Sequence, residues 1–384
     1  SWEGNRPTDD WKLSGKRDAA FALLCERAGV SCDPTPVAIN DACTNLGWCT
    51  TGCVRHGKNS VDLRYLQPAE DLGAEMRVGT RVERVTPAGP LDGRRWKVHT
   101  TRVADGATGV ILADTVVFAA GAVGSAVLLQ RSAAALPGGV SDHVGRNLSR
   151  GGDAMFPVVL PEGFGLDDME MMPGKIIGSC SFQYLFEPPP GFGPDWQRFI
   201  VQPMMMLPVI SAVLVADPHG ITSDGGDMRM FGLEQKRLME TWGTRLLHLG
   251  IMGVDGMDGS VRIDSSGKPN VRFSTSPATA GFRAAARAGV RHIAEASGAQ
   301  VLPSWDELRN DALTIHPLGT CRMASGPDQG VVDHRCRVFT KSGAVHEGLY
   351  VTDASTYSSP IAVNTSLTAA AISERAMALM DEPG

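Results

Sequence analysis

The chain has 384 residues, of which 43% are hydrophobic and 20% charged, a balance that is typical of globular proteins in water. A chain of this length predicts two domains rather than a single core. The formal net charge of -6 argues against nucleic acid as a partner, because surfaces that bind phosphate backbones concentrate Lys and Arg.

A membrane span is also not expected. It would need roughly 18–20 uninterrupted apolar residues. The longest apolar stretch, residues 199–216, is broken by Gln202, Pro203 and Pro208. We therefore expect a soluble protein, and the sequence leaves its compartment open.

Eight cysteines are too few for a disulfide scaffold in a chain of this length. Three of them, Cys43, Cys49 and Cys53, lie close together in the sequence. Their spacing lacks the paired C-x-x-C units of a structural zinc site. We favour buried or redox-silent thiols over a metal site, and expect no metal.

The first part of the chain predicts two helices followed by strands. Helical spacing of four apolar residues predicts a helix over residues 16–27, ended by Gly29; they are Ala20, Phe21, Leu24 and Ala28. Asn59-Ser60 predicts the start of a second helix that ends near Gly73. Alternating apolar residues over 74–100 then indicate a run of strands.

Residues 110–121 predict one continuous buried strand, followed by a turn of small residues at 122–125 and a helix over 126–132. Doubly wound folds bring backbone close to a phosphate or a ring in this way. The alternative is a plain strand, turn and helix packing unit, and this stretch alone does not exclude it.

The middle of the chain, residues 151–258, is rich in Met, Pro and Gly. Its methionines would give a soft apolar lining if they faced one cavity, or they fill an ordinary core. We interpret this region as a second domain that supplies substrate contacts. Residues 259–273 then predict a hairpin, and 278–296 a helix ended by Gly298.

Three polar residues near the end of the chain are candidates for chemistry. His316 precedes Pro317, which fixes its backbone, and imidazole suits a group that takes and returns a proton; the alternative is a structural donor. Asn364 lies at or beside the N-cap of a helix over 367–380, where its amide can bind a substrate oxygen or cap the helix. Asp353 ends a strand over 349–352, where a carboxylate binds ribose or ribityl hydroxyls or closes a turn.

Together and in this order, these residues resemble the glucose–methanol–choline (GMC) family of FAD-dependent oxidoreductases. Residues 316–323, His-Pro-Leu-Gly-Thr-Cys-Arg-Met, look like that family's catalytic-histidine motif, and 353–375 like its closing motif. Residues 121–125 with Leu128-Leu129 resemble its internal signature, although Ala126 stands where proline is common. Residues 47–60 are similar to a cysteine-rich segment of its sugar-acid, sterol and long-chain-alcohol branches.

The resemblance implies an α/β fold (α+β overall), with an incomplete FAD-binding Rossmann-like domain and a second, antiparallel-sheet substrate domain. We expect domain boundaries at 1–150 (part of the FAD-binding domain), 151–311 (substrate-binding domain) and 312–384 (C-terminal part of the FAD-binding domain). The resemblance makes His316 and Asn364 catalytic. It assigns FAD contacts to six residues: Val82, Gly121, Asp353, Ala354, Asn364 and Thr365.

The implied activity is oxidation of a CH–OH group in a small-molecule alcohol, with the sugar, sterol and long-chain classes all open. The electron acceptor, oxygen or a quinone, also stays open. One departure from the family is the lack of its G-x-G-x-x-G turn. We therefore expect a separate N-terminal fragment or subunit to complete the FAD site. Alternatives are a flavin-containing lyase of the same fold and a non-catalytic fragment that needs a complementing N-terminal part.

Overall fold

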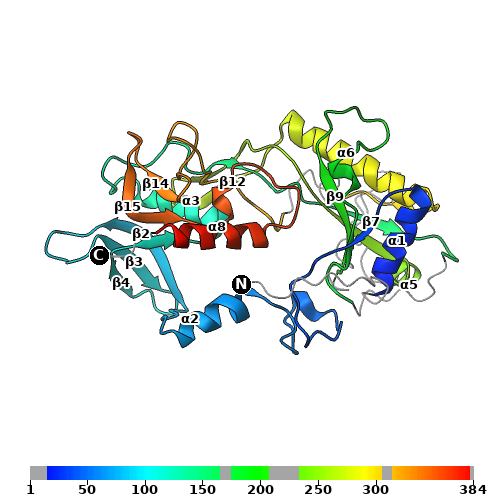
Figure 1. Ribbon diagram of the computed structural model, residues 1–384, viewed down its shortest axis with the longest axis horizontal. Coiled ribbons are helices and arrows are strands. Elements are labelled where there is room, and N and C mark those ends of the chain that lie inside the picture. The colour runs from blue at the N-terminus through cyan, green and yellow to red at the C-terminus, as the bar shows by residue number, and fades with distance from the viewer. Residues whose placement is uncertain (1–14, 165–173, 207–232, 305–313, 381–384) are drawn as a thin grey trace. The chain divides into compact units, whose positions relative to one another are not determined.

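The computed structural model describes residues 15–164, 174–206, 233–304 and 314–380. The chain forms two compact units, each built from three separate stretches (Figure 1). The described residues of Ser1–Glu75, Asp153–Gly253 and Gly281–Leu313 make unit 1. Those of Met76–Gly152, Val254–Ala280 and Thr314–Gly384 make unit 2.

Unit 1 is built on a four-stranded sheet in which every neighbouring pair is antiparallel. The strand order is β13 (Gln300–Val301), β7 (Ala154–Val159), β10 (Leu246–Gly253) and β9 (Phe199–Met204). All eight residues of β10 are buried, as expected for a central strand covered on both faces. This sheet confirms the antiparallel part of the predicted fold.

Helices α1 (Lys16–Ala28) and α6 (Pro277–Glu295) cover the same face of this sheet (Figure 1). Every second residue of β10 from Leu247 to Ile251 belongs to the same hydrophobic cluster as residues of both helices. Because side chains two positions apart in a strand point to the same face, both helices pack on that face. Phe21 of α1 and Phe282 of α6 are fully buried there, each contributing about 1.5–3 kcal/mol of apolar burial. Trp242, the last residue of α5 (Leu233–Trp242), joins Val159 and Leu246 in a separate cluster.

The rest of unit 1 consists of short elements. Strand β1 (Asp33–Pro34) pairs with β8 (Ser179–Cys180), and a single helical turn, η4, spans Gln183–Leu185. The segment after β1 holds three short helices: η2 (Trp48–Thr50), η3 (Asp62–Leu66) and α2 (Gln67–Asp71). The helix predicted from Asn59 to Gly73 is therefore present, but it begins at Asp62 and its first part is a π-helix.

Unit 2 contains three three-stranded sheets. The first is an antiparallel meander of β2 (Thr80–Pro87), β3 (Trp96–Arg102) and β4 (Thr108–Ala113). The second joins the predicted hairpin, β11 (Gly259–Ile263) with β12 (Pro269–Arg272), to β6 (Arg146–Leu148). The third has the order β14 (Arg337–Phe339), β15 (Val345–Val351) and β5 (Val116–Phe118).

The third sheet has the layering of a doubly wound fold. Strands β15 and β5 are parallel, with Val351 opposite Phe118. Leu349 and Val351 share a cluster with α3 (Gly121–Ser132), whereas Tyr350 shares another with Ala376 of α8 (Ser366–Ala378). Because neighbouring side chains of a strand point to opposite faces, α3 and α8 cover opposite faces of this sheet.

One predicted strand is wrong. Residues 110–121 form the end of β4, a break at Asp114, and then the short β5 and the first residue of α3. Asp114 forms an ion pair with Arg94, and β4 belongs to the meander whereas β5 pairs with β15. A run of apolar residues carries no information on which partner each part of it will find.

Among the described residues, the methionines of the middle region do not line one common cavity. Met205, Met206 and Met252 are buried in unit 1. Five others lie outside the described residues: Met169, Met171, Met172, Met228 and Met230. The expected domain boundary at 311/312 also lies outside them.

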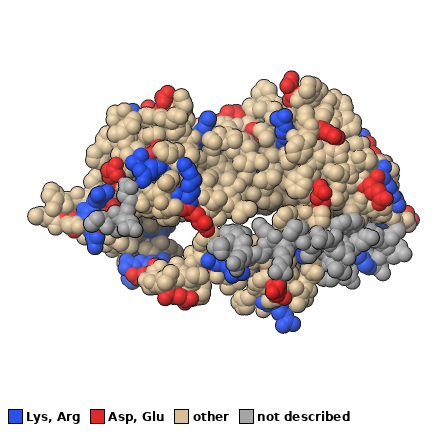
Figure 2. Space-filling model, viewed as in Figure 1, with Lys and Arg blue, Asp and Glu red and all other residues tan. Residues whose placement is uncertain are grey.

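Charges are mixed on the molecular surface. On the face in Figure 2, basic and acidic side chains are interspersed rather than gathered by sign. Within the ranges given above, no helix combines the length and apolar character needed to cross a bilayer.

His248 of β10 gives unit 1 a pH-dependent stability. The side chain is 1% exposed, and burial lowers its pKa from 6.5 to about 4. Between these pH values the imidazole is protonated in the unfolded chain but not in the folded chain. Proton binding therefore stabilises the unfolded state, and the resulting loss of folding stability is absent above pH 6.5 and grows as the pH falls toward 4. At about pH 5 this amounts to about 2 kcal/mol of lost stability.

We expect the unfolding free energy of the His248→Gln variant to fall by about 2 kcal/mol less than that of the wild type between about pH 7.5 and about pH 5. The measurement is urea unfolding at about pH 7.5 and pH 5 for both proteins, comparing their differences in unfolding free energy. The exposed His334, changed to Gln, is the control and should retain the wild-type difference. An unchanged difference in His248→Gln would contradict the assignment.

Candidate functional site

Asp353 lies at the carboxyl ends of the parallel strands β5 and β15, where doubly wound sheets bind their ligands. Its Oδ2 accepts hydrogen bonds from Gly121 N at 2.8 Å and Ser125 Oγ at 2.5 Å. Its Oδ1 accepts one from Ser355 N at 2.9 Å, capping the short helix η6 (Ala354–Thr356). One carboxylate therefore fastens the start of α3 to the start of η6.

Gly121 has open space around it. Its φ is +75°, a left-handed conformation that favours glycine, and a Cβ built there would meet no atom within 4 Å. The two residues before it, Ala119 and Ala120, are exposed. A ligand can therefore approach the backbone of this turn closely.

An apolar cavity of about 540 Å³ adjoins the same turn, a volume within the usual range for small-molecule sites. Val82 of β2 lines it together with Ala120 and Gly124 of the turn and first part of α3. Most of its remaining lining comes from β5 and from apolar residues of β2, β3 and α3. The cavity brings Val82 close to the turn that contains Gly121.

His316 is half-buried, and its backbone is held on two sides. Its N–H donates to Thr314 Oγ1 at 3.0 Å, and that hydroxyl donates to Arg150 O at 2.8 Å. A Cβ on Gly151, where φ is +69°, would lie 3.0 Å from His316 Cβ and 2.8 Å from His316 O. Glycine at 151 therefore leaves room for the histidine backbone.

A buried polar cluster supports this arrangement. Asp255 Oδ1 accepts a hydrogen bond from Ser149 Oγ at 2.5 Å, and Oδ2 accepts one from Arg150 N at 3.1 Å. Arg150 Nε also lies 3.9 Å from Asp255 Oδ2, and both side chains are fully buried. Burial raises the pKa of Asp255, against the opposing effect of these donors. Ser149 also pairs with Leu318, two residues after His316.

The segment after His316 runs along η6. Gly319 N donates to Ala354 O at 3.1 Å, Cys321 N to Ser355 O at 2.8 Å, and Met323 N to Thr356 O at 2.8 Å. Cys321 is fully buried, and burial raises the pKa of its thiol to about 12. This cysteine is a packing residue rather than a nucleophile.

Asn364 is tied to η6 from the other direction. Tyr357, which follows η6, donates its hydroxyl to Thr365 O at 2.6 Å, and burial raises the pKa of that hydroxyl to about 12. Thr365 is buried and is the N-cap of α8, whereas Asn364 lies one residue before the cap with an exposed side chain. Asn364 therefore stands beside the cap position, and its amide faces solvent.

The structure thus brings together most of the predicted site segments. The backbones next to His316 and Asn364 are both anchored to η6, and Asp353 and Ala354 form its start. The carboxylate of Asp353 reaches Gly121 directly, and the cavity with Val82 adjoins that turn. Sequence patterns did not identify Thr314, Gly151 or Asp255; the paired glycines at 151 and 152 were the one local signal for a close backbone approach.

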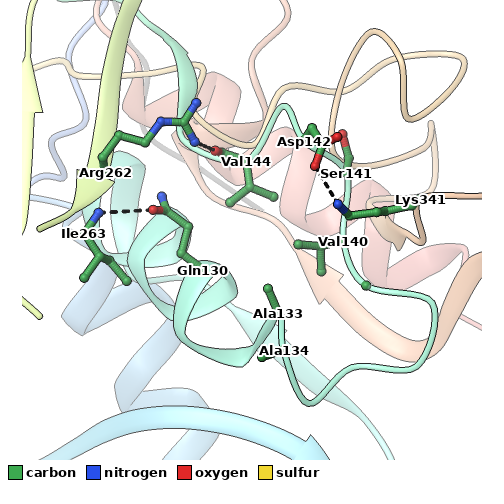
Figure 3. Close-up of a pocket in the computed structure, with 11 residues that line it drawn as sticks. Gln130, Ala133, Ala134, Val140, Ser141, Asp142, Val144, Arg262, Ile263 and Lys341 are labelled. Atoms are coloured by element: carbon green, nitrogen blue, oxygen red, sulfur yellow. Dashed lines mark hydrogen bonds and ion pairs between the residues drawn. The ribbon is translucent and has the colours of Figure 1, made fainter. Parts of the chain in front are cut away.

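A second cavity in unit 2, of about 520 Å³, has a mixed lining, and its polar side chains bind neighbouring groups (Figure 3). Arg262 donates to Val144 O at 2.8 Å, Lys341 pairs with Asp142 at 2.9 Å, and Ile263 N donates to Gln130. These contacts fasten α3 to β11 and to neighbouring loops. We assign this cavity no ligand.

Comparison with known proteins gives a consistent result. Two family models, each described as GMC oxidoreductase, match residues 8–150 and 256–373. A cholesterol oxidase from Acinetobacter baumannii is 27% identical over 378 residues, which cover 87% of this chain and 60% of that protein.

Two solved structures are similar in fold. Pyridoxine 4-oxidase from Mesorbium loti has a TM-score of 0.57 at 18% identity, covering 94% of this chain and 69% of that one. A fungal aryl-alcohol oxidase has a TM-score of 0.56 at 17% identity, covering 94% and 70%. At these identities the likeness shows the fold, and it confirms the predicted combination of an FAD-binding fold with an antiparallel-sheet domain.

Changing Asp353 tests how much the site depends on its carboxylate. In Asp353→Asn, an amide N–H₂ would face donors at Gly121, Ser125 or Ser355, so at least one hydrogen bond is lost. We expect the free energy of unfolding to fall by about 1–3 kcal/mol, measured by denaturant titration. The exposed Asp105, changed to Asn, is the control and should have little effect; equal stabilities of the two variants would contradict the anchoring role.

Proposed function

Because this chain belongs to the GMC oxidoreductase family, whose members are FAD-dependent enzymes, we propose that it oxidises the CH–OH group of an alcohol. The observation that supports this most strongly is the double anchoring of η6 to the segments of His316 and Asn364. The chain spans about 60% of the length of the cholesterol oxidase it matches. The activity is therefore proposed for the complete enzyme.

His316 is the proposed base. It takes the hydroxyl proton of the alcohol, and this makes loss of hydride from the carbon that bears the hydroxyl group more favourable. Its backbone is restrained by Thr314, Gly151 and the following Pro317, which limits the orientations that the imidazole can take. Such restraint reduces the entropy cost of reaching a reactive geometry.

Asn364 is the proposed partner of His316. Its exposed amide can donate to the substrate oxygen and stabilise the negative charge that develops as the proton leaves. The nearby start of α8 adds partial positive charge from unpaired backbone N–H groups. Base and charge-stabilising donor would thus act on one oxygen.

The same geometry supports the six FAD contacts that we propose. Val82 offers an apolar cavity wall and Gly121 an open turn. Asp353 and Ala354 form the start of η6, and Asn364 and Thr365 precede α8, which Tyr357 ties to the end of η6. Asp353 has three protein donors and retains acceptor capacity for a ligand hydroxyl. When bound, FAD supplies the acceptor for the hydride.

One relative supports a choice among the substrate classes. Of the sugar, sterol and long-chain classes, the cholesterol oxidase match makes sterols the first to assay. The electron acceptor, oxygen or a quinone, is a separate question that oxygen consumption measures directly.

We expect His316→Ala to slow flavin reduction by the alcohol about 10²–10⁴-fold while substrate affinity changes much less, because the base acts on the transition state. Anaerobic stopped-flow measurement of flavin bleaching in the FAD-loaded enzyme gives both quantities. The exposed His334, changed to Ala, is the control. Equal losses of rate and affinity would count against the base role, and a wild type that never bleaches while converting substrate would indicate a lyase.

We further propose that additional polypeptide, in the same chain or supplied separately, completes the FAD site by pairing with β5. Strand β5 ends its sheet, and its second edge has no strand partner among the described residues. Val117 of β5 is 38% exposed and lines the apolar cavity with its neighbours. Unpaired strand edges bind extended chain by main-chain hydrogen bonds.

Hydrogen exchange tests this pairing. In the FAD-bound complete protein we expect slow exchange of the backbone amides at 116–118, compared with the 384-residue chain alone. Val117→Lys should weaken FAD retention, because it places a charge in the cavity; Val110→Lys, on the exposed strand β4, is the control. Equally fast exchange at 116–118 in both forms would sink the pairing while leaving the proposed alcohol oxidation intact.

A further inference from the structure

A cavity of about 550 Å³ in unit 1 is lined by a loop that the proposed oxidation does not use. The loop spans residues 49–58 and contributes Cys49, Cys53, His56 and Lys58 to the cavity wall. Three of the eight cysteines, Cys43, Cys49 and Cys53, belong to this region, and all three are partly exposed.

The loop is clamped to the chain before it. Asn40 N donates to Gly57 O at 3.0 Å and Asn40 Nδ2 to His56 O at 2.9 Å, while Ile39 and Lys58 form an isolated β-bridge. Gly57 packs so closely that a Cβ there would lie 2.7 Å from Cys43 Cα. The surroundings of Cys53 are therefore fixed by backbone contacts.

These surroundings favour a thiolate at Cys53. The Cys53 Sγ accepts a hydrogen bond from Gly57 N at 3.3 Å. Hydrogen bonds from the N–H of Arg55, then of Gly57 and Lys58, together with the Lys58 ammonium, lower the pKa of the Cys53 thiol. Backbone N–H groups that converge in a turn are a known way of stabilising an anion.

Cys49 has a contrasting environment in the same cavity. It is half-buried, and burial raises the pKa of its thiol, with further contributions from Cys43 and Cys53. The Lys58 ammonium donates to Cys49 O at 3.1 Å, so one cation lies beside both cysteines. Two cysteines that line one cavity, one with a lowered and one with a raised thiol pKa, have the contrast of a dithiol redox pair.

We propose that Cys53 is a peroxide-reactive thiol and that Cys49 is its resolving partner. The Cys53 thiolate attacks one oxygen of a peroxide, the O–O bond breaks, and sulfenic acid forms with release of hydroxide or alkoxide. The Cys49 sulfur then attacks the Cys53 sulfur, its proton leaves with the hydroxyl group as water, and a Cys49–Cys53 disulfide results. The peroxide is the oxidant, and two electrons pass to it from the two sulfurs.

Two observations set this pair apart. Four other cysteines, Cys25, Cys180, Cys321 and Cys336, are buried, and their thiol pKa values are raised. Among the residues that the structure describes, no group of three or more His, Cys, Asp or Glu side chains is arranged to hold a metal ion.

Mass spectrometry of the native protein tests the pair. After brief exposure to dilute hydrogen peroxide, peptide mapping should find a Cys49–Cys53 disulfide, with Cys25, Cys180, Cys321 and Cys336 still reduced. In Cys49→Ser, Cys53 should instead be trapped as sulfenic acid by dimedone. Peroxide that oxidises the buried cysteines first, or all cysteines alike, would overturn the proposal.

The rate of alkylation tests the thiolate. Iodoacetamide should modify Cys53 faster than every other cysteine, and Lys58→Gln should slow this reaction several-fold. Lys268→Gln removes an exposed lysine of unit 2 and should not change it. The proposal would be contradicted by equal rates of Cys53 alkylation in the two lysine variants, or by a Cys53 that reacts only after treatment with a chelator. Neither outcome would bear on the proposed alcohol oxidation.

Discussion

The carboxylate of Asp353 is the interaction on which the candidate site depends. It accepts hydrogen bonds from Ser355 and from Gly121 and Ser125, which lie more than two hundred residues earlier in the sequence. Its negative charge lies at the first turn of α3, where the helix dipole favours an anion. This contact links the turn at Gly121 to the start of η6, although the two follow different strands.

The remaining contacts extend outward from that point. Main-chain hydrogen bonds attach the segment after His316 to one side of η6, and the Tyr357 hydroxyl attaches the start of α8. The buried pair of Asp255 and Arg150 then supports the chain that passes beneath His316. Removing one member of such a buried pair leaves the other uncompensated, so this support is sensitive to substitution even though it contacts no ligand.

Local patterns predicted the regular elements and failed where partners are distant. The helices α1 and α6 and the hairpin of β11 and β12 follow from spacing, cap and turn residues, because those signals act within a few residues. The apolar stretch from 110 to 121 was misinterpreted because its two halves belong to different sheets. Asp114, a charged residue within that stretch, marks the division, but only the strand partners explain it.

The candidate site divides in the same way. His316, Asn364 and Asp353 stood out because each lies beside a local signal, which is a proline for His316, a helix start for Asn364 and a strand end for Asp353. Thr314 and Gly151 were not identified, because the hydrogen bond and the close packing that give them a role reach across about 160 residues. For the methionines of the middle region the signal was composition, and composition does not specify where each side chain will lie.

The open edge of β5 also has a consequence for how this chain behaves in isolation. Within the described part of the chain no strand pairs with this edge, and an apolar strand edge of this kind can pair with extended peptide, including the same strand of a second molecule. Self-association through that edge is therefore expected of residues 1–384, and an extended segment paired with β5, as proposed above, would shield the strand.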